Sequence, residues 1–214
     1  MIARADNEAI IDAWWRETVR CRICPALSPW RKFAASNHGA PNHGLMILGE
    51  APGRISLDNG RRFSNPRNLT IRRAFARAAA PAKIEIEELF YMTDTVKCWP
   101  PSPTGANRSP TLAEERTCVK LHLMREIELL KPRLIFAFGA RASRAALGYE
   151  VNLSLEHGKA HRGVHGIRVI PLMHPSTANI AGMKRAGIGS LAEYEDGLAW
   201  LMRTELKRLE RGRE

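Results

Sequence analysis

The stretch LMILGEAPG, residues 45–53, decides the expected fold of this 214-residue chain. A short apolar run bounded by glycine and proline is typical of a buried strand. A parallel strand of this kind ends in a loop at the carboxyl edge of its sheet, where α/β proteins bind ligands. That loop carries the acid Glu50, while Gly49 and Gly53 let backbone approach a ligand and Phe63 follows in the next segment. The stretch therefore predicts a ligand pocket with an aromatic ring that can stack on a flat group.

Strand patterns alternate with helix patterns on either side of this stretch. We expect strands at residues 45–48, 89–96, 134–138 and 167–172, and helices at 4–20, 68–80, 111–130, from 139 onward and at 190–210. Thr111 and Glu114 have the spacing of a capping box, and Pro132 ends that helix. The alternation predicts an α/β fold, a three-layer α/β/α sandwich with a central four-stranded parallel sheet. No internal repeat is visible, so we expect a single domain over residues 1–214.

The chain is strongly basic, with a net charge of +11 from 33 Lys and Arg against 22 Asp and Glu. This excess favours a polyanionic partner such as nucleic acid, or an anionic membrane surface, although an ordinary basic protein is also compatible with it. No apolar run is long enough to cross a membrane, so we expect no membrane partner. The amino terminus lacks the apolar core of a secretory signal, and a cytoplasmic location is therefore expected.

Four cysteines occupy suggestive positions. Cys21 and Cys24 form a C-x-x-C after a helix, Cys98 ends an expected strand, and Cys118 lies inside a helix. A cytosolic protein has little use for structural disulfides, so metal and redox roles compete, and a redox C-x-x-C normally follows a strand. Zinc and an iron–sulfur cluster both take four thiolates. The spacing alone leaves a cluster, a zinc site and unrelated buried cysteines open, although Cys98 and Cys118 are not spaced as a zinc knuckle.

Five motifs occur in a fixed order along the chain: CRICP (21–25), GEAPG (49–53), G-R-x-F (60–63), TDTVKCWPP (93–101) and MHPS (173–176). In this order they resemble the uracil-DNA glycosylase superfamily, above all its iron–sulfur members, families 4 and 5. GEAPG is similar to family 4, whereas HPSTAN (174–179) followed by Gly182 is similar to family 5. The resemblance implies a four-stranded parallel sheet between helices. It also implies one [4Fe–4S] cluster held by Cys21, Cys24, Cys98 and Cys118.

A glycosylase extrudes its target nucleotide, grips the base in a pocket and cleaves the N-glycosidic bond. By resemblance, Phe63 stacks on uracil, His174 bonds the base O2 as negative charge develops there, and Ser176 donates to a DNA phosphate. The matched backbone positions of the substrate site are Gly49, Ala51 and Gly53. Taken without the resemblance, Phe63 is also consistent with a core residue, and a lone histidine after a strand, as His174 is, is more often structural.

The residue that guides the attacking water is not decided by the motifs. The best-known glycosylases of the superfamily carry an aspartate where this chain has Ala51. Glu50 matches the family 4 glutamate, whereas the family 4 acidic pair corresponds to Ser56 and Leu57, with Asp58 one place later. We expect Glu50 or Asp58 to position water or to stabilise the cationic sugar. Each is also consistent with a capping or salt-bridging surface acid.

Asp94 is the informative departure, because families 4 and 5 carry asparagine at the matched position. An asparagine amide accepts from uracil N3–H and donates to O4, whereas an ionised aspartate has only acceptors. Asp94 is therefore protonated by burial, or acts as general base or water guide, or shifts the base preference. An acceptor pair suits the cytosine amino group better than O4, but removal of unmodified cytosine would be toxic. We therefore expect uracil or another deaminated base.

Basic residues flank the expected pocket. Arg61, Arg62, Lys184 and Arg185 are candidate DNA contacts, and a solvated basic face is the alternative interpretation of each. We expect a monomeric, monofunctional DNA glycosylase that uses water, because no lysine occupies a matched catalytic motif, although Lys97 is close. One alternative is a degenerate relative that binds damaged or abasic DNA with little turnover. Another is an RNA-binding protein that carries zinc or a cluster.

Overall fold

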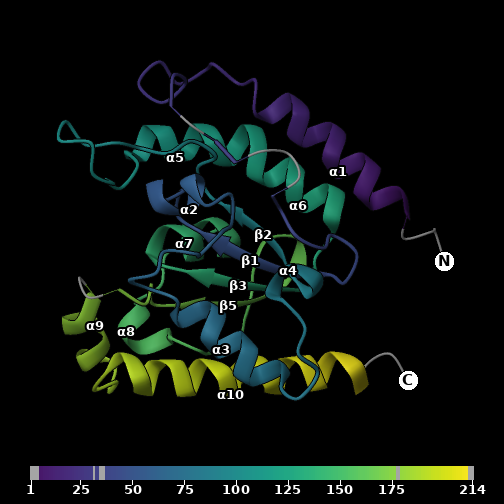
Figure 1. Cartoon of the computed structure of the whole chain (residues 1–214), viewed down its shortest axis with the longest axis vertical. Coiled ribbons are helices and arrows are strands. Elements are labelled where there is room, and N and C mark those ends of the chain that lie inside the picture. The colour runs from purple at the N-terminus through teal and green to yellow at the C-terminus, as the bar shows by residue number, and fades with distance from the viewer. Residues whose placement is uncertain (1–4, 31, 34–36, 177–178, 212–214) are drawn as a thin grey trace.

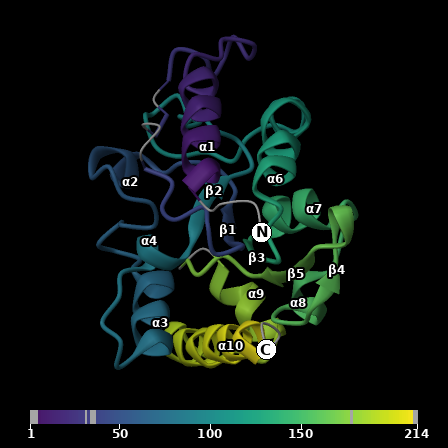
Figure 2. The ribbon, with the colours of Figure 1, turned by 90° about the vertical axis from the view of Figure 1, so that its right-hand side faces the viewer.

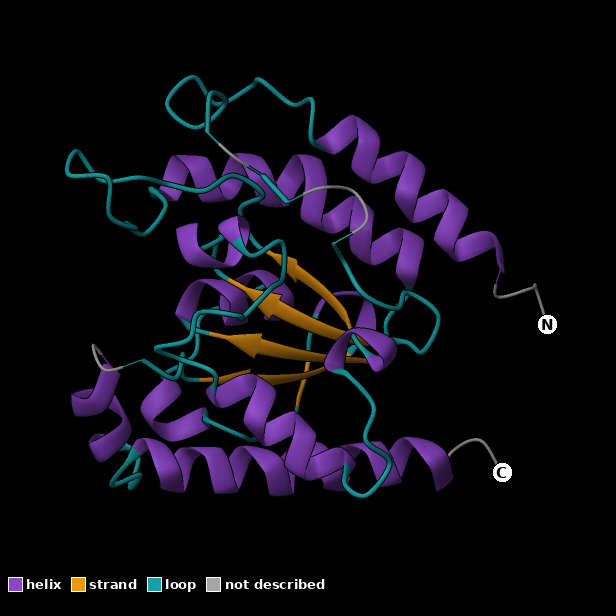
Figure 3. Cartoon of the chain, viewed as in Figure 1, coloured by secondary structure: helices purple, strands orange, loops and turns teal. Residues whose placement is uncertain are grey.

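The protein is described from a computed structural model that covers residues 5–30, 32–33, 37–176 and 179–211. Its sheet has the order β2-β1-β3-β5-β4. The first four of these strands run parallel: β1 (Leu45–Gly49), β2 (Tyr91–Asp94), β3 (Leu134–Phe138) and β5 (Arg168–Leu172). The expected α/β fold with four parallel strands is confirmed (Figure 3). The two-residue β4 (His161–Arg162) adds an antiparallel fifth strand, which is too short to leave a pattern in the sequence.

Alternating side chains of the sheet build one hydrophobic core on each face. Leu45 and Ile47 of β1 join one core, whereas Met46 and Leu48 join the other, as the two-residue period of a strand requires. The first core is covered by α3 (Thr70–Ala79) and α10 (Leu191–Arg211), and the second by α1 (Ala5–Thr18), α6 (Met124–Leu130) and α7 (Ala140–Leu147). Figures 1 and 2 show these helices on opposite sides of the sheet. Helices therefore cover both faces of the sheet, which gives the expected three-layer α/β/α arrangement.

The remaining helical elements are short. They are α2 (Arg54–Asp58), α4 (Ile86–Leu89), α5 (Leu112–Cys118), the π-helical segment η1 (Val119–Leu123), α8 (Leu153–Glu156), the 3₁₀ segment η2 (Val164–Gly166) and α9 (Ile180–Arg185). The expected helix over 111–130 is confirmed as α5, η1 and α6 in succession. Its capping box is present, because the Thr111 hydroxyl accepts from Glu114 N–H at 3.2 Å and Glu114 Oε2 accepts from Thr111 N–H at 2.7 Å.

The expected strand at 89–96 is too long at both ends. A second capping box, between Glu85 and Glu88, starts α4, which runs to Leu89. The strand β2 begins only at Tyr91 and ends at Asp94, because the residues after Asp94 turn across the sheet edge. Within the described part of the chain, no helix is both long and apolar enough to cross a membrane. The single-domain organisation of residues 1–214 stays a prediction.

The order of the strands determines where a ligand can enter. The chain passes from β1 to β2 on one side, and β3 then pairs with β1 on the other side. Such a change of direction opens a crevice at the carboxyl ends of the strands. The arrows in Figure 3 point to this edge, which the loops after β1, β2, β3 and β5 share.

Candidate active site

A cavity of about 180 Å³ lies at this carboxyl edge. It is walled by the loops that follow β1, β2 and β5, together with the segment between α2 and α3. Eight of the predicted site residues line it: Gly49, Glu50, Ala51, Gly53, Arg62, Phe63, Asp94 and His174. Residues that are far apart in the sequence therefore meet in one cavity.

Phe63 occupies an unusual backbone conformation at this wall. Its φ of 54° lies in the left-handed region, which a large aromatic residue rarely adopts. Such strain costs about 1–3 kcal/mol and persists only where the surroundings enforce it. Here the guanidinium of Arg72 donates to the carbonyl oxygen of Arg62, from Nε at 3.0 Å and from Nη2 at 2.5 Å. The ring of Phe63 is thereby held against the cavity, 6.2 Å from the ring centroid of Phe138.

Asp94 is buried and forms an ion pair that the sequence did not indicate. Arg62 Nη1 donates to Asp94 Oδ2, and the two side chains are only 3% and 6% exposed. The guanidinium of Arg62 faces inward and is almost fully buried, which argues against the expected contact with a DNA phosphate. Burial raises the pKa of Asp94, while the charges of Arg62 and Lys97 act against that increase. Because a buried arginine cation requires a counter-charge, we assign Asp94 as the ionised partner.

His174 follows β5 on a segment that two side chains fix. The Tyr194 hydroxyl donates to the Met173 carbonyl oxygen at 2.5 Å, and His157 Nδ1 accepts from Met173 N–H at 3.1 Å. Burial lowers the pKa of His174, so its imidazole is neutral at pH 7. A neutral imidazole can donate one N–H to a carbonyl oxygen without placing a full positive charge in the cavity.

The rest of the His174 segment is held by asparagines that precede α3 and α9. Asn68 Nδ2 donates to the Pro175 carbonyl oxygen, and Asn179 Nδ2 donates to the His174 carbonyl oxygen at 2.9 Å. Ser176 is half-buried beside the cavity but does not line it. Residues 177 and 178 of the motif lie outside the described residues.

The two candidate water guides lie in different places. Glu50 lines the cavity, is 30% exposed, and has its Oε1 3.8 Å from Arg141 Nε. Asp58 is 47% exposed on α2, where its carboxylate is 3.9 Å from Arg54 Nε. The α2 helix buries Ser56, so Asp58 two positions later falls on another side of this short helix and does not line the cavity. Its position argues against the expectation that Asp58 guides water.

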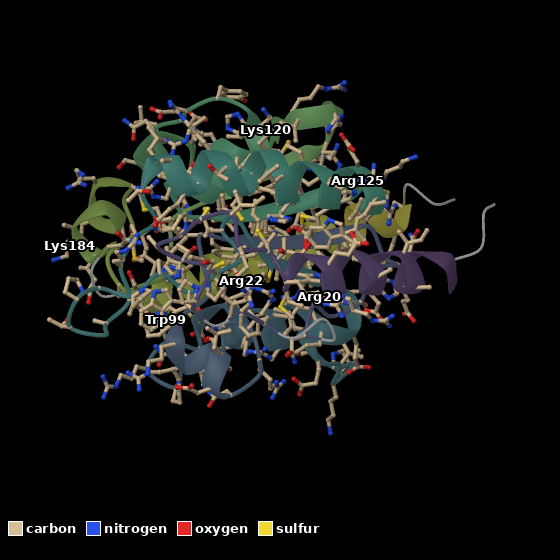
Figure 4. All side chains as sticks on the ribbon, turned by 90° about the horizontal axis from the view of Figure 1, so that it is seen from above. Arg20, Arg22, Trp99, Lys120, Arg125 and Lys184 are labelled. Carbon is tan, nitrogen blue, oxygen red and sulfur yellow. The ribbon has the colours of Figure 1, made fainter. Side chains whose placement is uncertain are left out.

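The predicted DNA contacts other than Arg62 are exposed. Arg61 is 52% exposed and is paired with Glu85 at 2.9 Å and with Glu87 at 3.2 Å, which reduces the charge it offers to a phosphate. Lys184 and Arg185 lie exposed on α9. Figure 4 shows Lys184 at the same end of the molecule as Trp99, which is the end towards which the strands point.

The four cysteines surround one small second cavity, of about 20 Å³, between the segment after α1, the segment after β2 and α5. Lys97 N–H donates to Cys118 Sγ at 3.3 Å, and burial raises the pKa of the Cys118 thiol to about 12. A metal would have to displace that proton. Among the described residues, no three metal-ligating side chains are close enough to hold one ion. The four thiols therefore surround a small cavity and do not converge on the position of a single ion. Four sulfur donors around an apolar space are compatible with a metal group that is bound by thiolates.

A family model described as the uracil DNA glycosylase superfamily matches residues 36–190. The chain belongs to the uracil-DNA glycosylase superfamily. The match spans more than half of the sequence and, among the described residues that line the cavity, includes all but Phe33.

Similar individual proteins carry related names. The chain is 34% identical over 127 residues to the type-4 uracil-DNA glycosylase of Pyrobaculum aerophilum, a match that covers 59% of each chain. It is 30% identical over 171 residues to the type-4 uracil-DNA glycosylase of Thermotoga maritima, covering 79% of this chain and 83% of that one. A type-5 uracil-DNA glycosylase of Pyrobaculum aerophilum is 35% identical over 105 residues, a match that covers 48% of this chain and 43% of that one. The resemblance to types 4 and 5 is thus confirmed.

Lys97 connects the two cavities of this superfamily member. Its ammonium group donates to Glu126 Oε2 at 2.6 Å, to Thr93 Oγ1 at 2.7 Å and to the Asp94 carbonyl oxygen at 2.6 Å. Lys97 and Glu126 are 1% and 0% exposed. All three N–H donors of the Lys97 ammonium are therefore engaged, and no lysine of the described residues lines the cavity at the carboxyl edge.

Several lining residues of the glycosylase-like cavity were missed from the sequence. Asn65 and Asn68 follow the G-R-x-F motif, and Asn107 comes from the proline-rich segment after β2. Asn107 Oδ1 accepts from Trp99 Nε1 at 2.8 Å and from Arg54 N–H at 3.2 Å, which brings that segment to the cavity. The only available signal was the concentration of asparagines after the motif, since asparagine is also common in turns.

Proposed function

We propose that the chain is a monofunctional DNA glycosylase that removes uracil, or another deaminated base, from DNA and leaves an abasic site. The convergence of Phe63, Asp94, His174 and Glu50 in one cavity carries this proposal. Together they supply a stacking ring, a hydrogen-bond acceptor, a neutral donor and a carboxylate. The names of the type-4 and type-5 relatives support the same reaction class.

The base is bound and released by the walls of the cavity. After the nucleotide leaves the DNA helix, its base stacks on Phe63, and His174 donates an N–H to the base O2. As the N-glycosidic bond breaks, its electron pair moves onto the base, and the bond from His174 strengthens with the developing negative charge. The released base anion then takes a proton from solvent.

Water completes the reaction at the sugar. Glu50 lines the cavity, which Asp58 does not reach, and its carboxylate lies 3.8 Å from the guanidinium of Arg141. The water oxygen bonds to C1′ of the cationic sugar while its proton passes to Glu50. The buried ion pair of Lys97 with Glu126 keeps that amine from attacking the sugar, in accord with a water mechanism. Ser176, Lys184 and Arg185 would contact DNA phosphates.

We further propose that Cys21, Cys24, Cys98 and Cys118 hold a [4Fe–4S] cluster. The four thiols enclose one apolar cavity, and the Lys97 N–H that already donates to Cys118 Sγ suits a thiolate sulfur. When bound, the cluster would supply metal–thiolate bonds that join the segment after α1 to α5 and to the segment after β2. Hydrolysis of the glycosidic bond needs no electron transfer, so we assign the cysteines a structural role.

Release of bases from matched oligonucleotides tests the proposed activity. The substrates contain uracil, hypoxanthine, xanthine, thymine opposite guanine, or cytosine. We expect uracil release by the wild type and a loss of about 10- to 100-fold in Phe63→Ala, because base stacking on an aromatic ring contributes about 1–3 kcal/mol. Affinity for undamaged DNA should persist, because phosphate contacts supply it. Trp200→Ala, which removes a 66% exposed ring on α10, is the matched control.

The alternative is a damage-binding protein of the same fold with little turnover. Asp94 in place of the family asparagine is the observation that favours it, together with Ser56 and Leu57 where family 4 has acids. No release from any substrate, combined with tight binding of uracil-containing or abasic DNA, would replace the enzyme by this alternative. We also propose that the single domain acts as a monomer, which sedimentation of the free protein and of its DNA complex would test.

A further inference from the structure

We propose that Arg62 and Asp94 act together as one base-reading unit that selects the hydrogen-bonding edge created by deamination. This inference rests on the proposed glycosylase function and concerns how that site chooses its base. Both side chains line the cavity in which the base is proposed to bind, here called the base cavity, and Asp94 stands where families 4 and 5 carry a neutral asparagine.

The guanidinium of Arg62 is fixed from several sides. One Nη1 hydrogen is donated to Asp94 Oδ2, and Nε donates to the Asn37 carbonyl oxygen at 3.2 Å. The plane of the group also rests on aromatic rings, with Cζ 4.1 Å from the ring centroid of Phe33 and 5.5 Å from that of Trp15. Arginine has five N–H donors, so these contacts leave donors for a ligand in the cavity.

The second carboxylate oxygen of Asp94 faces the place where a base would stack. A Cβ added at Gly49 would lie 2.5 Å from Asp94 Oδ1 and 3.4 Å from Phe63 Cζ. The acceptor and the stacking ring therefore flank the same small space, and it is open because Gly49 has no side chain. Beside this acceptor stands the donor group of Arg62. The wall presents an acceptor next to a donor.

Deamination creates the complementary edge. Cytosine offers an acceptor at N3 and a donor at its amino group, whereas uracil offers a donor at N3–H and an acceptor at O4. The same exchange turns the N1 and amino group of adenine into the N1–H and O6 of hypoxanthine. Asp94 can accept from the N–H, and Arg62 can donate to the adjacent carbonyl. An amino-bearing base would instead place a lone pair against the carboxylate and an amino group against the guanidinium.

The charged pair differs from an asparagine because its donor and its acceptor cannot exchange places. An amide can rotate to exchange its oxygen and nitrogen, so an unsupported asparagine matches either edge. In the pair, only Arg62 donates and only Asp94 accepts. Arg62 would also hold the oxygen of an asparagine placed at position 94 and turn its NH₂ towards the base. The residue that the family uses is therefore expected to harm uracil recognition in this chain.

The competing explanation is a buried ion pair that stabilises the fold without touching the base. The two explanations are distinguished by measuring DNA binding and base release with oligonucleotides that contain uracil or cytosine. Oligonucleotides with 2′-fluoro-deoxyuridine or 2′-fluoro-deoxycytidine report recognition without turnover, because the fluorine opposes formation of the cationic sugar. The variants are Asp94→Asn and the double variant Arg62→Met with Asp94→Asn. The control is Arg77→Gln on α3, whose arginine pairs with Asp196 on the adjacent helix α10 and does not line the base cavity.

We expect the wild type to bind the fluorouridine DNA more tightly than the fluorocytidine DNA. Asp94→Asn should lower the ratio of these two affinities by about 10²-fold, because polar groups of the base and of the cavity are left without partners. Uracil release should fall by a similar factor. The double variant should recover part of both, since its amide can turn freely and no lone charge is buried. Arg77→Gln should keep the wild-type ratio.

An unchanged ratio in Asp94→Asn, accompanied only by a lower melting temperature, would overturn the inference in favour of the structural pair. Should Asp94→Asn fail to fold, Arg62→Lys provides the same test, because lysine keeps the charge but lacks the fixed planar donors. A ratio unchanged in Arg62→Lys would then reject the inference. A wild type that discriminates the fluorinated DNAs but releases no base would instead reject the proposed enzyme while supporting the base-reading pair.

Discussion

An added Cβ at Gly49 would lie within 2.5 Å of the Asp94 carboxylate and would point between it and the ring of Phe63. The backbone of β1 ends at this residue, and Thr95 N–H and the Thr95 hydroxyl both donate to its carbonyl oxygen, at 2.8 and 2.9 Å. Gly49 is therefore held in place, and it cannot retreat to make room for a side chain.

Gly49→Ala is expected to lower uracil release by about 10²-fold, because the methyl group displaces Asp94 or the base by a fraction of an ångström to an ångström. The rate is measured by single-turnover release from a uracil-containing oligonucleotide. Gly197→Ala on α10 is the control, since a Cβ there meets no atom within 4 Å. Equal rates for Gly49→Ala and the wild type would mean that the base does not occupy the space in front of Gly49.

At the scale of secondary-structure elements, Glu87 on α4 links Arg61, two residues before Phe63, to Arg72 on α3. Arg72 Nη2 donates to Glu87 Oε1 at 2.6 Å, and Arg61 Nε donates to the same carboxylate at 3.2 Å. Burial acts to raise the pKa of Glu87, but the hydrogen bonds from Arg72 and Arg61 outweigh it and lower that pKa to about 2. The pair also keeps Arg72 in position to hold the strained backbone before Phe63.

Glu87→Gln is expected to lower the free energy of unfolding by about 1–2 kcal/mol at neutral pH, after allowance for solvent screening. Because the folded pKa lies below the ordinary value of 4.5, this stabilisation is present above that value and is lost as pH falls towards about 2. Urea unfolding as a function of pH should therefore show the wild type and Glu87→Gln converging in acid.

Glu128→Gln provides the control for this titration. Glu128 forms an exposed pair with Arg125 at 3.4 Å on one helix, and such pairs contribute little to stability. Its loss should change the unfolding free energy by less than about 0.5 kcal/mol at every pH. A constant difference between the wild type and Glu87→Gln down to acid pH would contradict the assignment of the low pKa.

The elements were largely predictable, whereas the pairing of charges was not. Short apolar runs with glycine or proline at their ends indicated four buried strands, and local spacing indicated the capping box at Thr111. The inward orientation of Arg62 depends on Asp94, 32 positions away, and on aromatic rings from two other segments. Local patterns predict that an arginine in a loop is exposed. Local patterns also do not show which side of the short helix α2 carries Asp58, and the structure places it away from the lining of the cavity.

At the scale of the whole molecule, the cysteine cavity and the base cavity share structural parts. Lys97 donates its backbone N–H to Cys118 Sγ and its side chain to the Asp94 carbonyl oxygen. The chain between Cys24 and β1 also carries Phe33, whose ring supports Arg62. A group bound by the cysteines would therefore stabilise two of the contacts on which the base cavity depends.

Cys24→Ser is expected to abolish the visible absorption of an iron–sulfur cluster and the iron content of the purified protein. It should also lower the free energy of unfolding by at least about 3 kcal/mol, because metal binding contributes to folding. Thr117→Ser, which alters a neighbouring wall of the same cavity and leaves all four thiols, is the control. Zinc instead of iron in the wild type would exclude the cluster, and unchanged metal content in Cys24→Ser would exclude the ligand set.

The buried pair of Arg62 and Asp94 also limits how such a site can arise by inheritance. A lineage that replaces asparagine by aspartate alone buries a lone anion, and one that introduces the arginine alone buries a lone cation, each at a cost of several kcal/mol. Both intermediates would be selected against before the pair is complete. The two codons are thus expected to covary among descendants, so that arginine at the first position and aspartate at the second are gained, and lost, together.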